Sequence, residues 1–396
     1  MPEPGLFDGV LARGAVRPEV DDVAWLQAML DVEAALARAQ GSAHAAEIAG
    51  ACQAELFDPG RLGADAALTA NPVVPLVQGL RERVGPAAAA DVHRGATSQD
   101  VLDSAAMLVA RRALGALLED LRAAADAAAA LAAGHRETPI SGRTLLQPAV
   151  PTTFGLKAAG WVTALDEAAA RLEAVRSERL AVQLGGAAGT LAAMGDAGTD
   201  VLAALAQDLG LAEPVLPWHT DRTRIAELAG ALGEAAGVAA KAARDVVLLA
   251  QSEVGEVREG GDPRRGGSSA MPHKRNPVAA VSALACALQA PGLVATLLAA
   301  MAGEHERAAG AWQSEWQPLS DLLRLTGSAA AWVRDCLEHL EVDAARMRSN
   351  LDAVVATVGD GEQFDLGQAV PAAAALVDRA LAARPAATAR APSGGA

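Results

Sequence analysis

The sequence predicts an all-α protein whose core is a bundle of long helices. Residues typical of strands are rare, since the chain has no Tyr and 4 Phe among 396 residues, and alternating β-branched runs are hard to find. Several long segments instead carry helix-forming residues without an internal proline. Apolar residues recur in these segments at the spacing of one helix face. Helices of this length, lying side by side, form an elongated bundle.

The predicted long helices follow in chain order. The first should run from Thr97 to Gly134, because Thr97 with Asp100 three residues later is a capping pattern and Gly134 can end a helix. A second carries apolar residues at helical spacing, a third spans about 222–258, and a fourth follows Pro277. The apolar residues of the second helix are Trp161, Leu165, Ala169, Leu172 and Val175.

These elements predict three domains followed by a tail. Residues 1–95 form a smaller N-terminal helical domain, and residues 96–335 form the central long-helix bundle. Residues 336–382 form a small C-terminal helical domain. The last segment, 383–396, is low in complexity, and we expect it to be disordered.

Charge and cysteine content exclude several classes of protein. Lys and Arg number 33 against 48 Asp and Glu, a net charge of −15, which argues against nucleic acid or an anionic membrane as the main partner. The cysteines Cys52, Cys286 and Cys336 lie far apart and form no CxxC pair, so a zinc knuckle is not expected. An odd cysteine count and a start, MPEPGLFDGV, without the features of a secretory signal indicate a cytoplasmic protein.

One uncharged segment, residues 278–303, is long enough to span a bilayer. It is mostly alanine, it is interrupted by Gln289-Ala-Pro291-Gly292, and charged helices flank it. We therefore favour a helix at the buried centre of a bundle or of an oligomer.

The segment GGSSAMPHKRNP, residues 266–277, differs from the helices around it. Pro272 and Pro277 cannot continue a helix, and the small residues give a pliable backbone. Lys274 and Asn276 lie near the start of the next helix, where free amides and the helix dipole favour a bound carboxylate. Ser268 would then lie over the carbon next to that carboxylate and could remove its proton in a closed site. The alternative is a flexible surface linker.

Nucleotide and metal motifs are absent from the sequence. No Gly-Lys dipeptide occurs, so there is no Walker loop, and GGAAGT at 185–190 follows a helix rather than the strand that a dinucleotide site requires. His305-Glu306 lacks the second histidine of a zinc protease. We expect no cofactor and no metal.

The loop includes SSAMPHKRNP, which resembles the signature of the fumarase/aspartase superfamily, shared by adenylosuccinate lyase. Two further segments resemble shared regions of that family: VHRGATSQDV (92–101) and GRTLLQPAVPTTFG (142–155). The resemblance covers most of the chain. It implies a three-domain helical subunit and a homotetramer in which three subunits contribute to each active site. It also implies proton transfer α to a carboxylate through an enediolate intermediate.

By residue match, the resemblance gives Ser268 the position of the catalytic serine. The candidates for binding a small polycarboxylate substrate are Thr97, Ser98, Gln147, Arg222, Arg224, Ser269, Lys274, Asn276 and Arg307. Two purely structural alternatives remain for the arginines. Arg222 and Arg224 could form a solvated helix face, and Arg307 could pair with Glu304 on a helix surface.

Four histidines are possible acids or anion donors. His273 lies in the signature loop, which we define as residues 266–277, and His219 lies near the arginine pair, so these two are the leading catalytic candidates beside Ser268. His93 and His305 are weaker candidates of the same kind. The sequence does not decide which of them acts opposite Ser268.

The chain departs from the adenylosuccinate lyases at several positions. Leu145 stands in place of the histidine of the second region, Val281 replaces a glutamate after KRNP, and the segment ANPVVPLV (70–77) lacks another histidine. Trp312 and Trp316 stand where the lyases carry a serine and an arginine for the nucleotide phosphate. The two indoles lie four residues apart, so they share one face of a helix.

These departures resemble the cycloisomerase branch of the superfamily, whose members are intramolecular lyases that close a lactone. The leaving group of the reverse reaction is a tethered carboxylate, which is stable as it leaves and needs no proton from a histidine. Two other functions stay open: a fumarate-releasing lyase of the adenylosuccinate lyase type, and a non-catalytic helical scaffold. An intact Ser268–Lys274–Asn276 loop argues against the scaffold.

Overall fold

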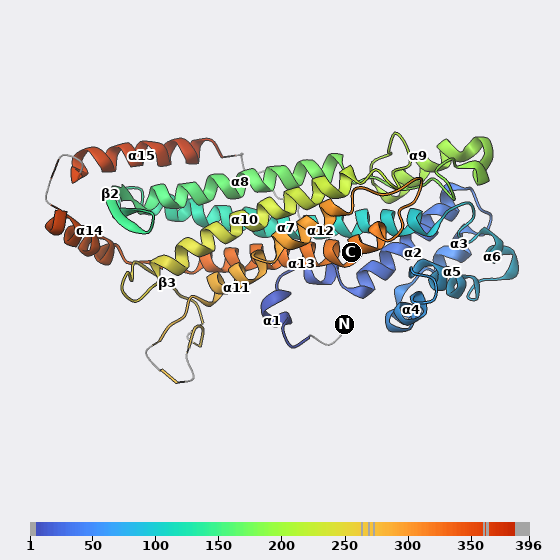
Figure 1. Ribbon diagram of the computed structural model, residues 1–396, viewed down its shortest axis with the longest axis horizontal. Helices are drawn as coiled ribbons and strands as arrows, with labels where there is room; N and C mark the ends of the chain where they lie inside the picture. Colours follow the sequence, from blue (N-terminus) through green and yellow to red (C-terminus); the bar gives the residue numbers. More distant parts are fainter. Residues whose placement is uncertain are drawn as a thin grey trace. The chain divides into compact units, whose positions relative to one another are not determined.

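The all-α prediction is confirmed by the computed structural model, which describes residues 5–384 except 263, 268, 269, 272, 273, 359, 360, 362 and 363. Its residues fall into two compact units. Unit 1 comprises Met1–Leu117, Arg171–Gly233 and Gln289–Ser328, and unit 2 comprises Leu118–Ala170, Glu234–Leu288 and Ala329–Ala396. The division into three domains remains a prediction. Four long helices contribute residues to both units (Figure 1): α7 (Ser98–Gly134), α8 (Phe154–Glu178), α10 (Thr223–Leu249) and α13 (Ala311–Glu338).

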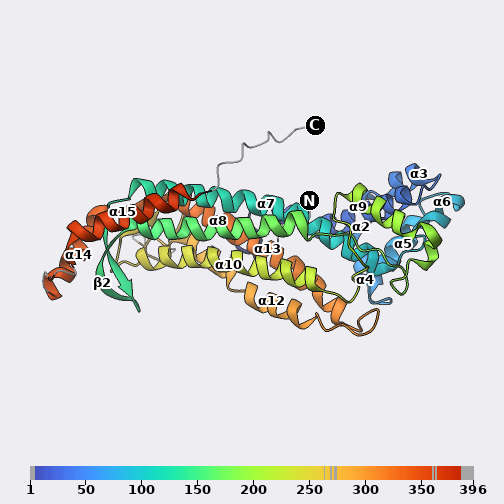
Figure 2. The ribbon, with the colours of Figure 1, turned by 90° about the horizontal axis from the view of Figure 1, so that it is seen from above.

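In unit 1, α2 (Asp22–Ala39) contacts α3 (Ala45–Ala51) and α9 (Gly198–Leu209) (Figure 2). The Asp21 side chain caps α2 by accepting a hydrogen bond from the Ala24 amide, 2.9 Å away. The other helices of this unit are α1 (Asp8–Leu11), α4 (Pro59–Ala66), α5 (Val73–Arg81), α6 (Pro86–Asp91) and α12 (Ala290–Ala299). Short 3-10 turns lie at Arg17–Glu19, Ala54–Leu56 and Ala192–Ala197.

The first long helix begins and ends as the sequence predicts. The Thr97 amide donates to the Asp100 carboxylate at 2.9 Å, which is one half of a capping box, and the helix ends at Gly134. The third long helix is shorter than predicted, because α10 ends at Leu249 rather than near residue 258. Beyond that point the Leu249 carbonyl accepts a hydrogen bond from the Glu256 amide at 2.9 Å instead of from a helical amide, and Gly255 adopts a φ of 63° in the turn that follows the helix.

In unit 2, the parts of the long helices that belong to it run side by side (Figures 1 and 2). The Trp161 indole donates to Asp245 at 2.8 Å and joins α8 to α10, and Arg334 of α13 pairs with Asp120 of α7 at 3.1 Å. The other helices of this unit are α11 (Val278–Ala287), α14 (Ala344–Val358) and α15 (Leu366–Ala382).

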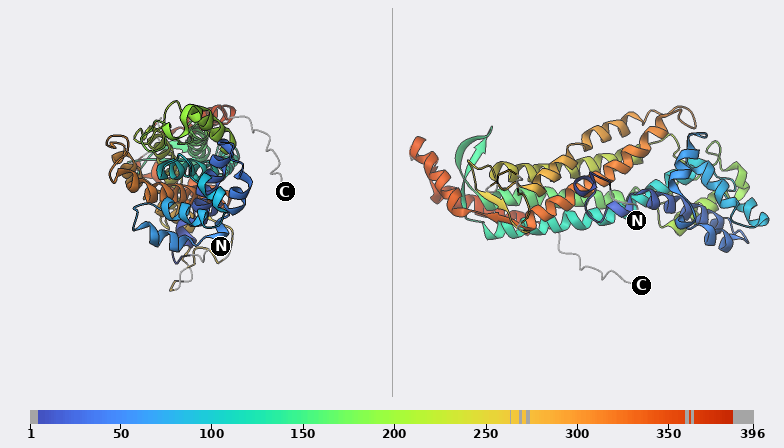
Figure 3. Two further views of the ribbon diagram at one scale, coloured as in Figure 1. Left: turned by 90° about the vertical axis from the view of Figure 1, so that its right-hand side faces the viewer. Right: turned by 90° about the horizontal axis from the view of Figure 1, so that it is seen from below.

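Two small antiparallel sheets of unit 2 were not predicted. A hairpin pairs β1 (Pro139–Thr144) with β2 (Gln147–Thr153), and β3 (Val257–Glu259) pairs with β4 (Leu340–Val342). Helix α14 packs on β1 and α15 packs on β2 (Figures 1 and 3). These strands are too short, and too rich in proline in the case of β1 and β2, to produce an alternating pattern.

The uncharged segment forms two helices rather than one, with α12 starting after a break and Pro291 in its first turn. By length and composition alone the segment Val278–Ala299 could cross a membrane, and 39% of its apolar window is buried. Val281 of α11 is 50% exposed, and Leu298 of α12 is 47% exposed. Burial at the centre of a bundle is therefore wrong for much of this segment within one chain, and burial in an oligomer remains a proposal.

Candidate active site

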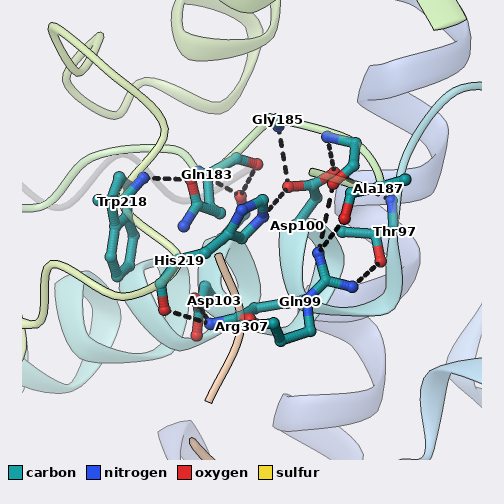
Figure 4. A network of polar contacts seen from close by, with 12 residues as sticks. Thr97, Gln99, Asp100, Asp103, Gln183, Gly185, Ala187, Trp218, His219 and Arg307 are labelled. Atoms are coloured by element: carbon teal, nitrogen blue, oxygen red, sulfur yellow. Dashed lines mark hydrogen bonds and ion pairs between the residues drawn. The ribbon is translucent and has the colours of Figure 1, made fainter. Parts of the chain in front are cut away.

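A buried carboxylate organises the start of α7 in unit 1. Asp100 is 1% exposed and accepts hydrogen bonds from the amides of Thr97, Gly185 and Gly186, each 2.9 Å long, and from His219 Nε2 at 2.7 Å (Figure 4). A buried carboxylate needs such donors to replace its lost water. The approach is close, because a Cβ on Gly185 would lie 2.8 Å from His219 Cε1. We call these five residues the Asp100 cluster.

One turn further along α7, Arg222 forms a second buried cluster with Asp103 and Glu315. The guanidinium is 3% exposed and contacts Asp103 through two nitrogens, at 2.7 and 3.0 Å, and Glu315 through Nη2 at 2.5 Å and Nε at 3.0 Å. Burial opposes its charge, but the two carboxylates outweigh that effect and raise the pKa of Arg222. Burial raises the pKa of Glu315, against the opposing effect of Arg222. We call these three residues the Arg222 cluster.

Trp312 and Trp316, in the first turns of α13, lie on one helix face, as the sequence predicts. Their ring centroids are 4.9 Å apart at an interplanar angle of 84°, an edge-to-face arrangement. The indole nitrogen of Trp312 donates to Asp103 at 3.0 Å, whereas the buried indole nitrogen of Trp316 has no partner within the described residues. Trp312 thereby ties α13 to the Arg222 cluster.

Gln99 connects the two clusters, and Gln183 holds the backbone beside His219 (Figure 4). Gln99 Nε2 donates to the His219 carbonyl at 2.9 Å and to Asp103 at 3.0 Å. Gln183 Oε1 accepts from the Trp218 amide at 2.8 Å. Sequence reasoning did not assign these residues to the site; with Asp100, Asp103 and Glu315 they form its buried framework. Polar residues three and four apart on an otherwise apolar face of α7 are the pattern that could have indicated part of it.

Arg307 and Thr97, both predicted to bind substrate, lie together. Arg307 is in a loop before α13, and its Nη1 donates to Thr97 Oγ1 at 2.7 Å, while Nη2 reaches the carbonyls of Gly186 and Ala187 at 3.3 and 3.2 Å (Figure 4). Its buried Nε has no partner among the described residues. The alternative pairing with Glu304 on a helix surface is wrong, because the Arg307 side chain points to Thr97.

The structure separates Arg222 from Arg224. Arg222 is buried, so a solvated helix face is wrong for it, while Arg224 Nη1 donates to the Arg179 carbonyl at 2.7 Å. His219 is 5% exposed and held by Asp100. Within unit 1, these contacts favour positioning roles for Arg222 and His219, and their predicted contact with substrate remains a prediction.

Ser98, the first residue of α7, opens onto a cleft of about 540 Å³ in unit 1. That volume lies within the usual range for small-molecule sites. The lining residues are Val73, Val74, Val77, Gln78, Arg81, Glu82, His93 and Ser98.

The remaining predicted residues belong to unit 2. Gln147 begins β2 and is exposed, and Lys274 is exposed in the signature loop. Asn276 closes the base of that loop, because its amide and its Nδ2 both donate to the Gly266 carbonyl, at 2.9 and 3.1 Å. Gly266 has a φ of 70°, and a Cβ there would lie 2.3 Å from the Asn276 carbonyl oxygen. Ser268, Ser269 and His273 lie outside the described residues.

The turn of the β1–β2 hairpin carries two strained, exposed leucines. Leu145 and Leu146 have φ angles of 50° and 65° and are 96% and 70% exposed. A two-residue turn with positive φ at both positions normally uses Asn and Gly. A leucine with positive φ costs free energy of folding, and strained residues of this kind are concentrated at functional sites. The turn lies in the second shared region, which agrees with such a role.

A family model described as a lyase matches residues 13–292, about seven-tenths of the chain. The chain belongs to this lyase family, the fumarase/aspartase superfamily. The chain is 51% identical over 357 residues to a 3-carboxy-cis,cis-muconate cycloisomerase of Bradyrhizobium diazoefficiens, covering 88% of this chain and 79% of that protein. It is 48% identical over 365 residues to a nitrosuccinate lyase of Streptomyces davaonensis, covering 88% and 77%.

Solved structures share the fold of this chain. A crystal structure of the 3-carboxy-cis,cis-muconate lactonizing enzyme from Pseudomonas putida matches it with a TM-score of 0.84 and 42% identity, covering 95% of this chain and 88% of that one. A fumarate lyase from Mesorhizobium sp. BNC1 matches with a TM-score of 0.81 and 30% identity, covering 97% and 100%. The resemblance drawn from the three sequence segments is therefore confirmed at the level of the family.

Proposed function

We propose that the protein is a 3-carboxy-cis,cis-muconate cycloisomerase, an intramolecular lyase of the protocatechuate branch of the β-ketoadipate pathway. It would interconvert 3-carboxy-cis,cis-muconate and 4-carboxymuconolactone. The observation that carries this proposal is the similarity to enzymes of that name along most of the chain, at 51% identity in Bradyrhizobium diazoefficiens and 48% in Pseudomonas aeruginosa.

The proposed reaction is an internal addition. One carboxylate oxygen of the substrate forms a bond to a carbon of the diene, and the carbon α to another carboxylate takes up a proton. In reverse, a base removes that proton, the electrons delocalise into the carboxylate as an enediolate, and the tethered carboxylate leaves. We assign the base to Ser268 and binding of the flanking carboxylate to Lys274, whose exposed ammonium is available for such a contact.

The hairpin turn supports a reaction that needs no acid for its leaving group. Leu145 stands where the resemblance places a lyase histidine, and a leucine cannot protonate an amine. A departing carboxylate is already a stable anion. The exposure of Leu145, at 96%, leaves this side chain available to another surface.

A second candidate follows from the Streptomyces relative, which matches this chain as well as the Pseudomonas aeruginosa cycloisomerase does. Nitrosuccinate would lose its nitro group as another stable anion, so Leu145 does not distinguish the two reactions. Adenylosuccinate, with an amine leaving group, is the substrate that Leu145 and the tryptophan pair disfavour.

One experiment separates these functions. Purified protein is offered 3-carboxy-cis,cis-muconate, nitrosuccinate and adenylosuccinate separately, while loss of diene absorbance and release of fumarate are followed. We expect loss of the diene and little fumarate from either succinate. Fumarate release without diene loss would transfer the assignment to a lyase, and no turnover of any of the three would favour a non-catalytic scaffold.

We also propose that the active form is a cytoplasmic homotetramer that needs no cofactor or metal. The exposed apolar residues Val281 and Leu298 support burial against other subunits, because single chains rarely leave such helices uncovered. Light scattering after gel filtration measures the mass directly. Dialysis against a chelator should leave the rate unchanged, and a lost rate that zinc or magnesium restores would contradict the metal-free mechanism.

A further inference from the structure

His93, only a weaker candidate from the sequence, lines the cleft beside Ser98 and pairs with Glu33, to which the sequence assigned no role. His93 Nδ1 lies 2.6 Å from Glu33 Oε1 of α2. The Glu33 side chain is fully buried, and its other oxygen, Oε2, has no hydrogen-bond partner among the described residues. His93 is 16% exposed and lines the cleft with Ser98. The buried carboxylate therefore stands behind a histidine that reaches the open space.

One ring nitrogen of His93 is left for a ligand. Nδ1 is taken by Glu33, and no hydrogen bond to Nε2 is found within the described residues, so Nε2 is the nitrogen that His93 can offer to the cleft it lines. His93 also has a φ of 60°, an uncommon conformation for a residue other than glycine. The strained backbone conformation therefore belongs to the residue that contacts Glu33 and also lines the cleft.

The burial of the Glu33 carboxylate favours a positive charge on the His93 ring. An ionised carboxylate with one unpartnered oxygen is costly in the interior unless a cation compensates it, and protonated His93 is the cation in contact. Burial alone would lower the pKa of His93, but the hydrogen bond and charge of Glu33 outweigh it and raise the pKa above its ordinary value. Asp100 on α7 acts in the same direction, and Arg81 on α5 opposes it.

The cleft is suited to an anion. Arg81 and Ser98 are among the residues that line it, and Ser98 begins a helix of 37 residues whose dipole places positive charge at that end. Glu82 also lines the cleft and is the opposing charge there. An apolar wall of three valines completes a surface that fits a small molecule with an acidic end.

We propose that the Glu33–His93 pair binds one carboxylate of the substrate, with the His93 Nε2–H donating to it beside the Ser98 hydroxyl. Glu33 is then a positioning residue that acts through His93. This inference rests on the proposed function, since a tricarboxylate must find a partner for each of its three charges. A merely structural pair would not need a charged ring facing open space.

The test uses Glu33→Gln, which keeps an oxygen for Nδ1–H but removes the charge. We expect the pKa of His93, followed by NMR of the ring nitrogens, to fall relative to the unaltered protein. At about pH 8 the KM for 3-carboxy-cis,cis-muconate should rise about tenfold with kcat nearly unchanged, because a charged donor is lost from binding. At about pH 6, where the ring is protonated without Glu33, the difference in KM should shrink.

Asp31→Asn is the matched control. Asp31 lies on the same helix and its substitution makes the same charge change, but it pairs with Arg112 at 2.7 Å rather than with His93. We expect it to change neither the His93 pKa nor KM. His93→Gln should raise KM at both pH values and remove the pH dependence that distinguishes Glu33→Gln.

A binding measurement keeps this inference separable from the proposed function. Propane-1,2,3-tricarboxylate, which cannot form a lactone, should shift the His93 ring signals in the unaltered protein and do so more weakly in Glu33→Gln. Unchanged signals at saturating tricarboxylate, or an unchanged His93 pKa in Glu33→Gln, would overturn the inference. Failure to turn over 3-carboxy-cis,cis-muconate, with these shifts still present, would instead remove only the proposed function.

Discussion

The Asp100 cluster of unit 1 and the signature loop of unit 2 carry parts of one family signature, yet they are built in opposite ways. In the cluster, Asp100 is buried, and both its oxygens are occupied by hydrogen bonds from the chain itself. In the loop, Gly266 and Asn276 close the base through hydrogen bonds, while the Lys274 side chain is exposed. A family signature therefore combines residues that build a site with residues that are free to meet a ligand.

Substitutions in the two regions should also differ in whether they first reduce stability or activity. Breaking a buried, fully bonded cluster leaves uncompensated charge inside the protein, so the first loss should be stability. Changing an exposed loop residue removes no internal bond, so the first loss should be function. Substitutions in the two regions should consequently divide between unfolding experiments and kinetics.

The largest effect should come from Ser268→Ala in the signature loop. If Ser268 is the base, turnover should fall by about a thousandfold or more, with the circular dichroism spectrum and the oligomer mass unchanged. Ser252→Ala, an exposed serine of the same unit, is the control and should keep the normal rate. Rates near normal in Ser268→Ala would remove this serine from the mechanism.

Arg222→Met should have the largest effect on stability. It leaves Asp103 and Glu315 buried without their cation, which should lower the free energy of unfolding by about 3–5 kcal/mol in urea. Lys274→Met makes the same chemical change in the exposed loop and should alter stability by less than about 0.5 kcal/mol while raising KM. Equal losses of stability in the two variants would contradict the division between the regions.

The base of the loop offers an intermediate test. Gly266→Ala places a Cβ against the Asn276 carbonyl at a positive φ, so we expect a loss of about 1–3 kcal/mol in stability and a marked fall in kcat. Gly267→Ala is the neighbouring control, because among the described residues the nearest atom to its Cβ would be the Arg264 carbonyl oxygen, at 3.6 Å. Similar kinetics for the two alanine variants would show that loop closure does not matter.

Substitutions in the β1–β2 hairpin turn should raise the stability of the protein, whereas the substitutions above lower it or leave it unchanged. Replacing Leu145 by Asn and Leu146 by Gly relieves two strained positions and should raise the stability of the protein by about 1 kcal/mol. Activity should nevertheless fall if the exposed leucines contribute to a site. Differential scanning calorimetry and kcat measured on the same sample decide this, and a variant that gains both stability and rate would speak against a functional turn.

The smallest effect concerns pH. Because the pKa of His93 is raised above 6.5, its pairing with Glu33 stabilises the fold fully below that pH, and this stability is lost as pH rises through the raised value. Urea midpoints of the unaltered protein and of Glu33→Gln should therefore converge as pH increases. A constant difference between the two proteins across this range would indicate that His93 does not titrate against Glu33.

The sequence predicted the fold well where periodicity is long, and the site less completely. The bounds of α7 follow from Thr97, Asp100 and Gly134, since capping residues and a helix period are local properties. The short strands and the early end of α10 depend on pairing partners far along the chain, which local patterns do not report. The same limit hid the role of Glu315, because nothing near it in the sequence indicates Arg222.

The candidate site shows the same division between residues. The match of Thr97 and Arg307 to the family placed two side chains that lie 2.7 Å apart, although 210 positions separate them. His93 was ranked below His219 and His273, since the sequence alone does not show that a buried glutamate 60 positions earlier stands behind it. Burial and orientation, rather than residue type, distinguish the histidines.

The left-handed turn at Leu145 has a consequence for how chemistry can diversify on this scaffold. Histidine tolerates that backbone conformation better than leucine does, so the turn already suits an imidazole at the position where the lyases carry one. One codon change could then supply a proton donor without rebuilding the hairpin. Descendants of a single ancestral protein could in this way cross between ring closure and amine elimination, and the strain would persist as a trace of that shared ancestry.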